Sequence, residues 1–261
     1  MRKARIGQRV FERRKHHFKK SSTAGLVLAG LTIGTLVLAT GSMGQGRDQG
    51  GSKSERFDLS VREDFFFGFA GDMKALARGM KKCEQALAKD PKNAEALVWH
   101  GSGLSYDAKR AFMAGDVEKG SQIQAQAVKE MNDAVTKRPD DVSVLIPRGS
   151  IFLSAALHVP SPEVAKKDFQ IAADDYEKVL RLQTPVFSKL SAHSRGELLG
   201  GLAEAWNGLG NTEKSRGYLQ RMMKEFPDTS YSRRAKEILS TVPKPGGLGT
   251  TCLGCHVGAT P

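Results

Sequence analysis

Three residues near the end of the chain have the types and the spacing of a cofactor-attachment site. Cys252 and Cys255 are separated by Leu253 and Gly254, and His256 follows directly. Two thiols three positions apart can reach both vinyl groups of one porphyrin, the next histidine can then ligate its iron, and Cys-x-x-Cys-His is the sequence of covalent haem attachment. The sequence therefore predicts one covalent haem c, held by Cys252 and Cys255, with His256 as an iron ligand.

Two other chemistries use the same residue types. A redox dithiol shares the Cys-x-x-Cys spacing but usually opens a helix after a strand, whereas a stretch rich in Gly and Pro precedes Cys252. A zinc site made of Cys252, Cys255 and His256 would need a fourth ligand and normally a second cysteine pair, and the third cysteine of the chain is the isolated Cys83. A thiol or metal module without haem stays open as an alternative.

The attachment motif resembles that of c-type cytochromes over about a dozen residues. Compact cytochrome c domains carry the motif near their start and a Met ligand far downstream, whereas five residues follow His256 here. Helical-bundle cytochromes carry it on their last helix, and the surrounding glycines argue against a helix in this chain. The resemblance implies a haem that carries single electrons and has no domain of its own. Such a haem exposes an apolar face and should dock against protein.

The second axial ligand of this iron is left open by the sequence. His158 and His193 are favoured, because residues in loops are free to approach a ligand. A five-coordinate iron is also compatible with the sequence. The remaining candidates are His100, Met113, Met222 and Met223.

The first forty residues predict export or anchoring. Residues 1–20 contain nine Lys and Arg and one acid, Glu12, so they contribute +8 of the net charge of +12. The rest of the chain carries only +4. That remainder is too small to favour nucleic acid as a partner. Residues 21–40 are uncharged and approach the roughly 20 residues that span a bilayer. They predict either a transmembrane anchor or a cleaved signal, which would place the chain after residue 40 outside the cytoplasm, in the bacterial cell envelope.

The rest of the chain divides into a linker, a helical domain and a tail. Residues 41–59 are rich in Gly and Ser and predict a flexible linker. Residues 60–240 have helical periodicity, so the fold class is all-α, and one expected antiparallel pair joins Ala94–Met113 to Val117–Lys137. Residues 241–261 form a haem-attachment tail without an apolar period. Prolines 91, 139, 185 and 227 follow apolar pairs at steps of 48, 46 and 42 residues, which indicates a stack of helix pairs.

The segment from Leu199 to Pro227 resembles a tetratricopeptide repeat. It has Leu202-Ala203, Trp206, Leu209-Gly210, Ser215 and Leu219 before its terminal Pro. The other three units match less well and are longer than the family period of about 34 residues. The resemblance implies a solenoid of four helix pairs, capped by Ser230–Leu239. In this solenoid Cys83 is expected to be a buried small hydrophobe, and Ser161 and Pro162 are expected to start a helix.

These expectations combine into one function and one alternative. The sequence predicts an exported, membrane-associated electron carrier whose helical array docks a redox partner protein or another copy of the chain. In the alternative, the array is an envelope assembly scaffold, and its haem or metal site is structural or sensory. No constellation of an enzyme stands out. Glu197 and Glu204 fall on one helix and are interpreted as solvated surface acids.

Overall fold

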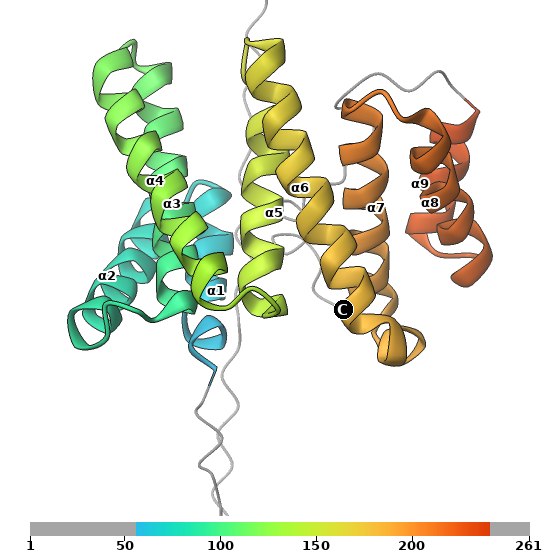
Figure 1. The fold of residues 1–261 in the computed structure, drawn as a ribbon, viewed down its shortest axis with the longest axis horizontal. Coiled ribbons are helices and arrows are strands. Elements are labelled where there is room, and N and C mark those ends of the chain that lie inside the picture. The colour runs from blue at the N-terminus through green and yellow to red at the C-terminus, as the bar shows by residue number, and fades with distance from the viewer. Residues whose placement is uncertain (1–55, 241–261) are drawn as a thin grey trace, which may run out of the picture. The chain divides into compact units, whose positions relative to one another are not determined.

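The computed structural model describes residues 56–240. It is all-helical, as expected, and it has no strand among these residues (Figure 1). The helices are α1 Phe57–Phe69, α2 Met73–Lys89, α3 Ala94–Met113, α4 Val117–Lys137, α5 Val142–Ala156, α6 Pro162–Gln183, the 3-10 helix η1 Thr184–Lys189, α7 Ala192–Gly208, α8 Thr212–Glu225 and α9 Ser230–Leu239.

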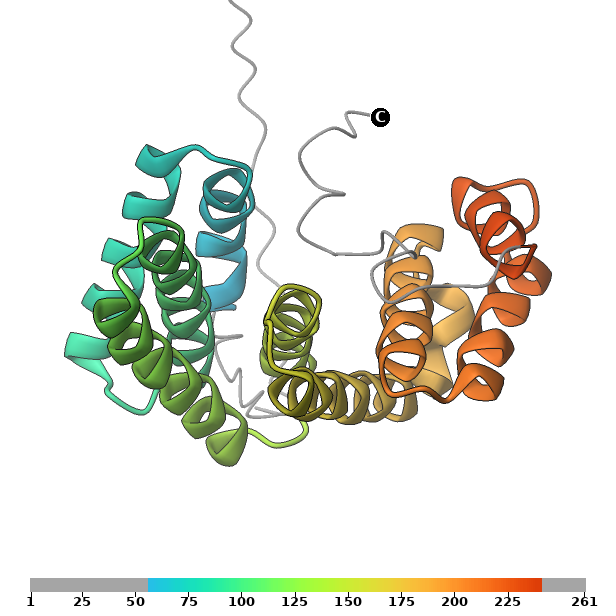
Figure 2. The ribbon, with the colours of Figure 1, turned by 90° about the horizontal axis from the view of Figure 1, so that it is seen from above.

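The helices pack in consecutive pairs, which confirms the expected pairing. Helix α1 contacts α2, α3 contacts α4, α5 contacts α6, and α7 contacts α8, while α9 packs on α8. Figure 2 shows the α3 and α4 helices side by side in a second view. Neighbouring pairs are joined through contacts such as α1 with α3, α3 with α5 and α6 with α7. One core therefore runs through all the pairs.

Turn chemistry in the sequence places the helix ends. The α3 and α4 bounds are those expected, and Gly115 between them has a φ of +82°, a left-handed conformation that glycine adopts without a Cβ penalty. Asp116 then caps α4 by accepting a hydrogen bond from Lys119 N–H at 3.1 Å. Ser161 caps α6, whose first residue is Pro162. Each of the four punctuating prolines follows the second helix of a pair.

The first helix begins earlier than the periodicity indicates. Helix α1 starts at Phe57, three residues before Ser60 and inside the segment expected to be linker. The Ser60 hydroxyl donates to the Phe57 carbonyl at 2.7 Å, and Phe57 packs against the core. The linker expectation is therefore wrong for residues 57–59. These residues extend the helix by less than one turn, and a single apolar residue, Phe57, is too little to show a helical period in the sequence.

The core packs closely where paired helices cross. A Cβ added to Gly101 of α3 would lie 2.9 Å from the Ala127 carbonyl oxygen and 2.8 Å from Met131 Cγ, both on α4. Cys83 on α2 is fully buried, as expected. Burial, together with the nearby Glu130, raises the pKa of its thiol. Cys83 therefore acts as a small core hydrophobe.

Among the helices of residues 56–240, none combines the length and the apolar character that crossing a bilayer requires. The expected anchor or signal at residues 21–40 lies outside the described range.

Candidate functional site

The residues expected to attach haem lie outside the described part of the chain. Cys252, Cys255 and His256 belong to residues 241–261, so the structure does not place them. Within residues 56–240 there is no cluster of His, Cys, Asp or Glu that could hold a metal ion. The described helices nevertheless show which surface of the domain has a shape and chemistry that could receive a haem.

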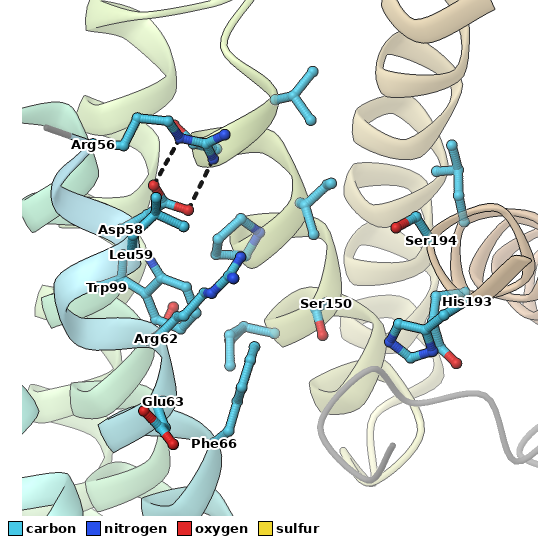
Figure 3. Close-up of a pocket in the computed structure, with 18 of the residues that line it drawn as sticks. Arg56, Asp58, Leu59, Arg62, Glu63, Phe66, Trp99, Ser150, His193 and Ser194 are labelled. Carbon is cyan, nitrogen blue, oxygen red and sulfur yellow. Dashed lines mark hydrogen bonds and ion pairs between the residues drawn. The ribbon is translucent and has the colours of Figure 1, made fainter. Parts of the chain in front are cut away.

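One cleft between the helices has this potential. Its volume is about 720 Å³, within the 300–1,000 Å³ typical of small-molecule and cofactor pockets. The first helices of the four pairs, α1, α3, α5 and α7, supply most of its walls (Figure 3). The cleft is broadly apolar; its apolar lining residues are Leu59, Phe66, Phe67, Phe69, Trp99, Val142, Ile146, Pro147, Ile151, Leu190 and Leu198.

Aromatic side chains form the α1 side of the cleft. Phe66 stands edge-on to Trp99, with 5.9 Å between ring centroids, an arrangement that aromatic pairs favour. Phe67 is 44% exposed and Leu59 is 49% exposed, although both are large apolar residues. Exposed apolar surface within a concave site is typical of a surface that binds something. Phe65 is buried in the core, and Phe66 and Phe69 pack against the core, so Phe67 is the exposed member of this aromatic group.

Two arginines reach the same cleft, and they differ in their partners. Arg56 makes a two-pronged ion pair with Asp58, with both N–O distances at 2.9 Å. Arg62, which lies within α1, has no carboxylate partner within residues 56–240 and extends from α1 into the open space (Figure 3). A guanidinium is suited to carboxylates and phosphates. Arg62 is therefore the cationic group in the cleft that an anionic ligand could engage.

His193 lines the opposite wall and stands at the head of a hydrogen-bonded chain. Its Nδ1 lies 2.7 Å from the Tyr231 hydroxyl oxygen. The Tyr231 hydroxyl in turn donates to Glu197 Oε1 at 2.7 Å. The chain links the first turn of α7 to α9 and back to the next turn of α7. Histidines that ligate metals commonly have such a partner on their other ring nitrogen.

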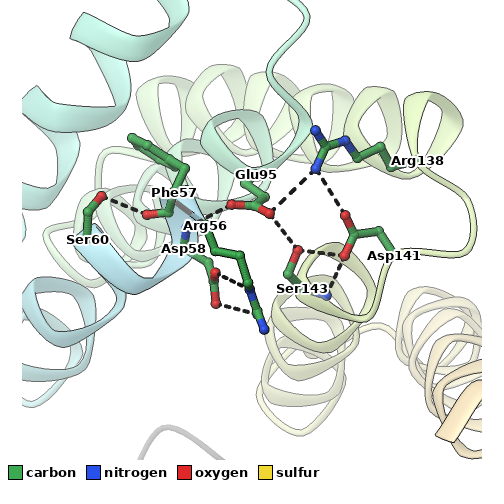
Figure 4. A network of polar contacts seen from close by, with 8 residues as sticks. All are labelled: Arg56, Phe57, Asp58, Ser60, Glu95, Arg138, Asp141 and Ser143. Carbon is green, nitrogen blue, oxygen red and sulfur yellow. Dashed lines mark hydrogen bonds and ion pairs between the residues drawn. The ribbon is translucent and has the colours of Figure 1, made fainter. Parts of the chain in front are cut away.

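A buried polar network fixes the α1 and α5 walls of the cleft (Figure 4). Glu95, in the first turn of α3 and 6% exposed, accepts hydrogen bonds from the Asp58 backbone N–H at 2.8 Å and from the Ser143 hydroxyl at 3.0 Å. Arg138 pairs with both Glu95 and Asp141. One carboxylate therefore ties the starts of α1, α3 and α5 together.

The other expected axial ligands do not reach this cleft. His158 is exposed after α5, where its Nδ1 lies 2.8 Å from the Ser154 carbonyl oxygen. His100 is held between α3 and α4 by Glu130, at 2.6 Å. Met113 is 78% exposed at the end of α3, Met222 is buried, and Met223 packs against the core. Of the six candidates, His193 is the one that lines the cleft.

Sequence reasoning missed several of these roles. No sequence motif marks Arg62 or Tyr231 as a site residue. The role of Tyr231 depends on the contact between α7 and α9, which is visible only in three dimensions. The interpretation of Glu204 as a solvated acid is wrong, since it is fully buried in α7. Glu197 also differs from that interpretation, because its Oε2 atom is buried. Helix α7 is enclosed by α6, α8 and α9, so both faces of this helix meet protein.

No protein-family model matches the chain, and a search of curated proteins finds no similar sequence.

Proposed function

We propose that this protein is an exported, membrane-associated monohaem c-type cytochrome that transfers single electrons. The observation that carries the proposal is the sequence Cys252-Leu-Gly-Cys255-His256. Each cysteine S–H would add across one vinyl double bond, so that sulfur forms the thioether and the hydrogen moves to the neighbouring carbon. This addition has no leaving group and needs no oxidant. His256 would supply one axial nitrogen, and the haem would supply the redox chemistry.

The amino-terminal segment supports this assignment. Covalent haem attachment takes place outside the cytoplasmic membrane, and residues 21–40 with their basic flank are typical of segments that send a chain there. A zinc or dithiol site would leave this combination of export and motif unexplained. The anchor and the cleaved signal both serve the proposal, because both deliver the tail to the same side.

The helical domain is proposed to be a tetratricopeptide-like solenoid that presents a docking surface. Four consecutive helix pairs, with prolines after each second helix, support this. Small residues where paired helices cross also support it: Gly101 meets α4, Gly68 meets Leu76 of α2, and Gly149 meets Tyr176 of α6. Such arrays bind many kinds of partner. The motif, and not the array, therefore carries the functional assignment.

The test is covalent haem in the exported protein. The full chain is expressed together with a cytochrome maturation system, purified from the envelope and stained for haem on a denaturing gel. We expect the wild-type band to stain and Cys255→Ala to lose most of its stain, because one of the two thioethers is gone. Cys83→Ala is the matched control, since it removes the buried cysteine outside the motif and should stain like wild type. A wild-type polypeptide with the mass of its amino acids alone would overturn the proposal.

Electron transfer is tested separately from attachment. The stained protein is titrated in a spectroelectrochemical cell, and its reduced form is mixed with an oxidised small redox protein. Reversible reduction and rapid exchange are the expected results. A haem that attaches but cannot be reduced within the range of envelope quinones would contradict the electron-carrier assignment while leaving the attachment chemistry intact.

A further inference from the structure

We propose that the haem-bearing tail of this chain docks in the cleft between α1 and α7, where His193 Nε2 is the second axial ligand of the iron and Arg62 engages a propionate. The inference rests on the proposed function, because it takes the haem on Cys252 and Cys255 as given. It goes beyond that function by naming where the haem lies and which described residues hold it.

The hydrogen-bonded chain sets the ring of His193 for ligation. The Tyr231 hydroxyl has one hydrogen and donates it to Glu197. It therefore accepts from His193 Nδ1, which must carry the proton. In a neutral imidazole the other nitrogen then has the lone pair, so Nε2 is the atom that would bind the iron, in place of any contact that it makes without the haem. Glu197 at the end of the chain strengthens the donor character of the ring, as carboxylates do behind metal-bound histidines.

Helix α6 separates His193 from the other favoured histidine. His158 precedes α6 and His193 follows it, and the 22 residues of this helix span about 33 Å at 1.5 Å per residue. A single iron cannot be reached from both ends. His193 lines the cleft, and His158 stands on the exposed elbow. The geometry thus selects one of two histidines that the sequence could not rank.

The tail is long enough to place its haem there. Ser240, the last described residue, lies nine residues after Tyr231 on or next to α9, a helical rise of about 14 Å. Tyr231 itself touches His193. From Ser240 to His256 there are 16 residues, which can span up to about 55 Å. The starting point and the contour length both allow the tail of the same chain to reach the cleft.

The lining of the cleft matches both the apolar macrocycle and the anionic propionates of a haem. The macrocycle is apolar and flat, and Phe66, Trp99 and Leu198 provide apolar walls. The propionates are carboxylates, and Arg62 offers a guanidinium without a carboxylate partner in the described range. The acids that line the cleft are Asp58, Glu63 and Glu197. Asp58 is paired with Arg56, and Glu197 accepts a hydrogen bond from Tyr231. Figure 3 shows Glu63 directed away from Arg62.

The decisive experiment is the ligation state of the matured full-length protein. We expect the oxidised wild type to show the low-spin spectrum of an iron with two nitrogen ligands. His193→Ala should retain its haem stain but become high-spin, and added imidazole should restore the low-spin spectrum. His158→Ala is the matched control and should remain low-spin. A high-spin wild type, or an unchanged spectrum in His193→Ala, would overturn the proposal.

A mixing experiment distinguishes the same chain from a second copy. His193→Ala protein, which carries haem, is mixed with Cys252→Ala/Cys255→Ala protein, which keeps His193 and carries none. If the tail docks in its own chain, the high-spin spectrum persists at all ratios. Recovery of the low-spin spectrum in the mixture would show that the cleft of another copy is the acceptor, and it would overturn docking within one chain.

Arg62→Gln gives a readout that does not depend on the folding of an α7 variant. Arg62 is exposed, so its replacement should leave the fold intact. Loss of a positive charge beside the haem favours the more positive, oxidised form, and the reduction potential should fall. Arg216→Gln on the exposed face of α8 is the control and should leave the potential unchanged. Equal potentials for Arg62→Gln and wild type would contradict the placement of the propionate.

These outcomes distinguish a failure of the docking proposal from a failure of the proposed cytochrome function. A wild type that carries covalent haem but stays high-spin overturns the docking and leaves the cytochrome assignment standing. A wild type without covalent haem overturns both, and this is read from the stain before any spectrum is recorded.

Discussion

At the residue scale, Asp168 on α6 is an acid whose surroundings disfavour its charge. It is partly buried, and no cation pairs with it within residues 56–240. Desolvation by burial raises the pKa of its carboxyl to about 6, from an ordinary value of 3.8. The folded state therefore binds a proton more tightly than the unfolded state does.

This difference predicts a pH-dependent stability. Because the folded pKa is raised, wild-type stability should fall as the pH rises from about 4 through about 6. Asp168→Asn has no such proton and should be more stable than wild type at pH 7, by on the order of 1 kcal/mol once solvent screening at a half-exposed site is allowed for. The two proteins should converge at pH 4. Urea unfolding at both pH values checks this, and a constant difference between them would contradict it.

Residue types and spacing predict the chemistry of the attachment motif, but they do not predict which described residues lie close together. The proposed roles of Cys252, Cys255 and His256 rest on their spacing alone. The burial of Cys83 was expected from its place on a helix face and is confirmed. The choice between His158 and His193 could not be made from the sequence, because both precede or begin a helix and both are flanked by turn residues. What separates them is Tyr231, a residue 38 positions downstream of His193.

At the element scale, the crossing of α3 and α4 limits the side chain at Gly101. A methyl group there would press on the Ala127 carbonyl, which is backbone and cannot rotate away. Overpacking of this kind costs about 1–3 kcal/mol, against a gain in helix propensity of about 1 kcal/mol. Gly101→Ala should therefore destabilise the protein or leave it at best unchanged, as measured by the midpoint of urea unfolding.

Gly217 provides a matched control for this prediction. It lies inside α8 on an exposed face, and an added Cβ there meets no atom within 4 Å. Gly217→Ala should stabilise the protein by about 0.5–1 kcal/mol, because only the backbone entropy term remains. If Gly101→Ala proved as stabilising as Gly217→Ala, the close crossing of α3 and α4 would be incorrect.

The elements were predictable wherever caps and prolines mark their ends. The bounds of α3 and α4 follow from an apolar period between Asn93, Gly115 and Asp116. The start of α1 did not follow, since Arg56 provides no side-chain cap and Phe57 stands alone before the periodic part. The 3-10 turn from Thr184 to Lys189 was also missed, because Pro185 indicates an end of helix but not the geometry that comes after it.

At the scale of the whole molecule, stability should decline toward the carboxyl-terminal helices. Helix α5 contacts α3, α4, α6 and α7, whereas α9 packs mainly on α8. In an array of nearest-neighbour contacts, the end units open with the lowest free energy. Amide hydrogen exchange read by mass spectrometry should therefore be faster in α9 than in α5. Equal protection of the two helices would mean that the array unfolds as a single cooperative unit.

The burial of Cys83 limits which thiols of the chain can react with one another. Thiol–disulfide exchange needs an accessible, deprotonated sulfur, and packing of α2 withdraws Cys83 on both counts. A chain that folds its helices first thus leaves Cys252 and Cys255 with only each other as intramolecular oxidation partners. A disulfide between Cys83 and either tail cysteine would require helix α2 to open first.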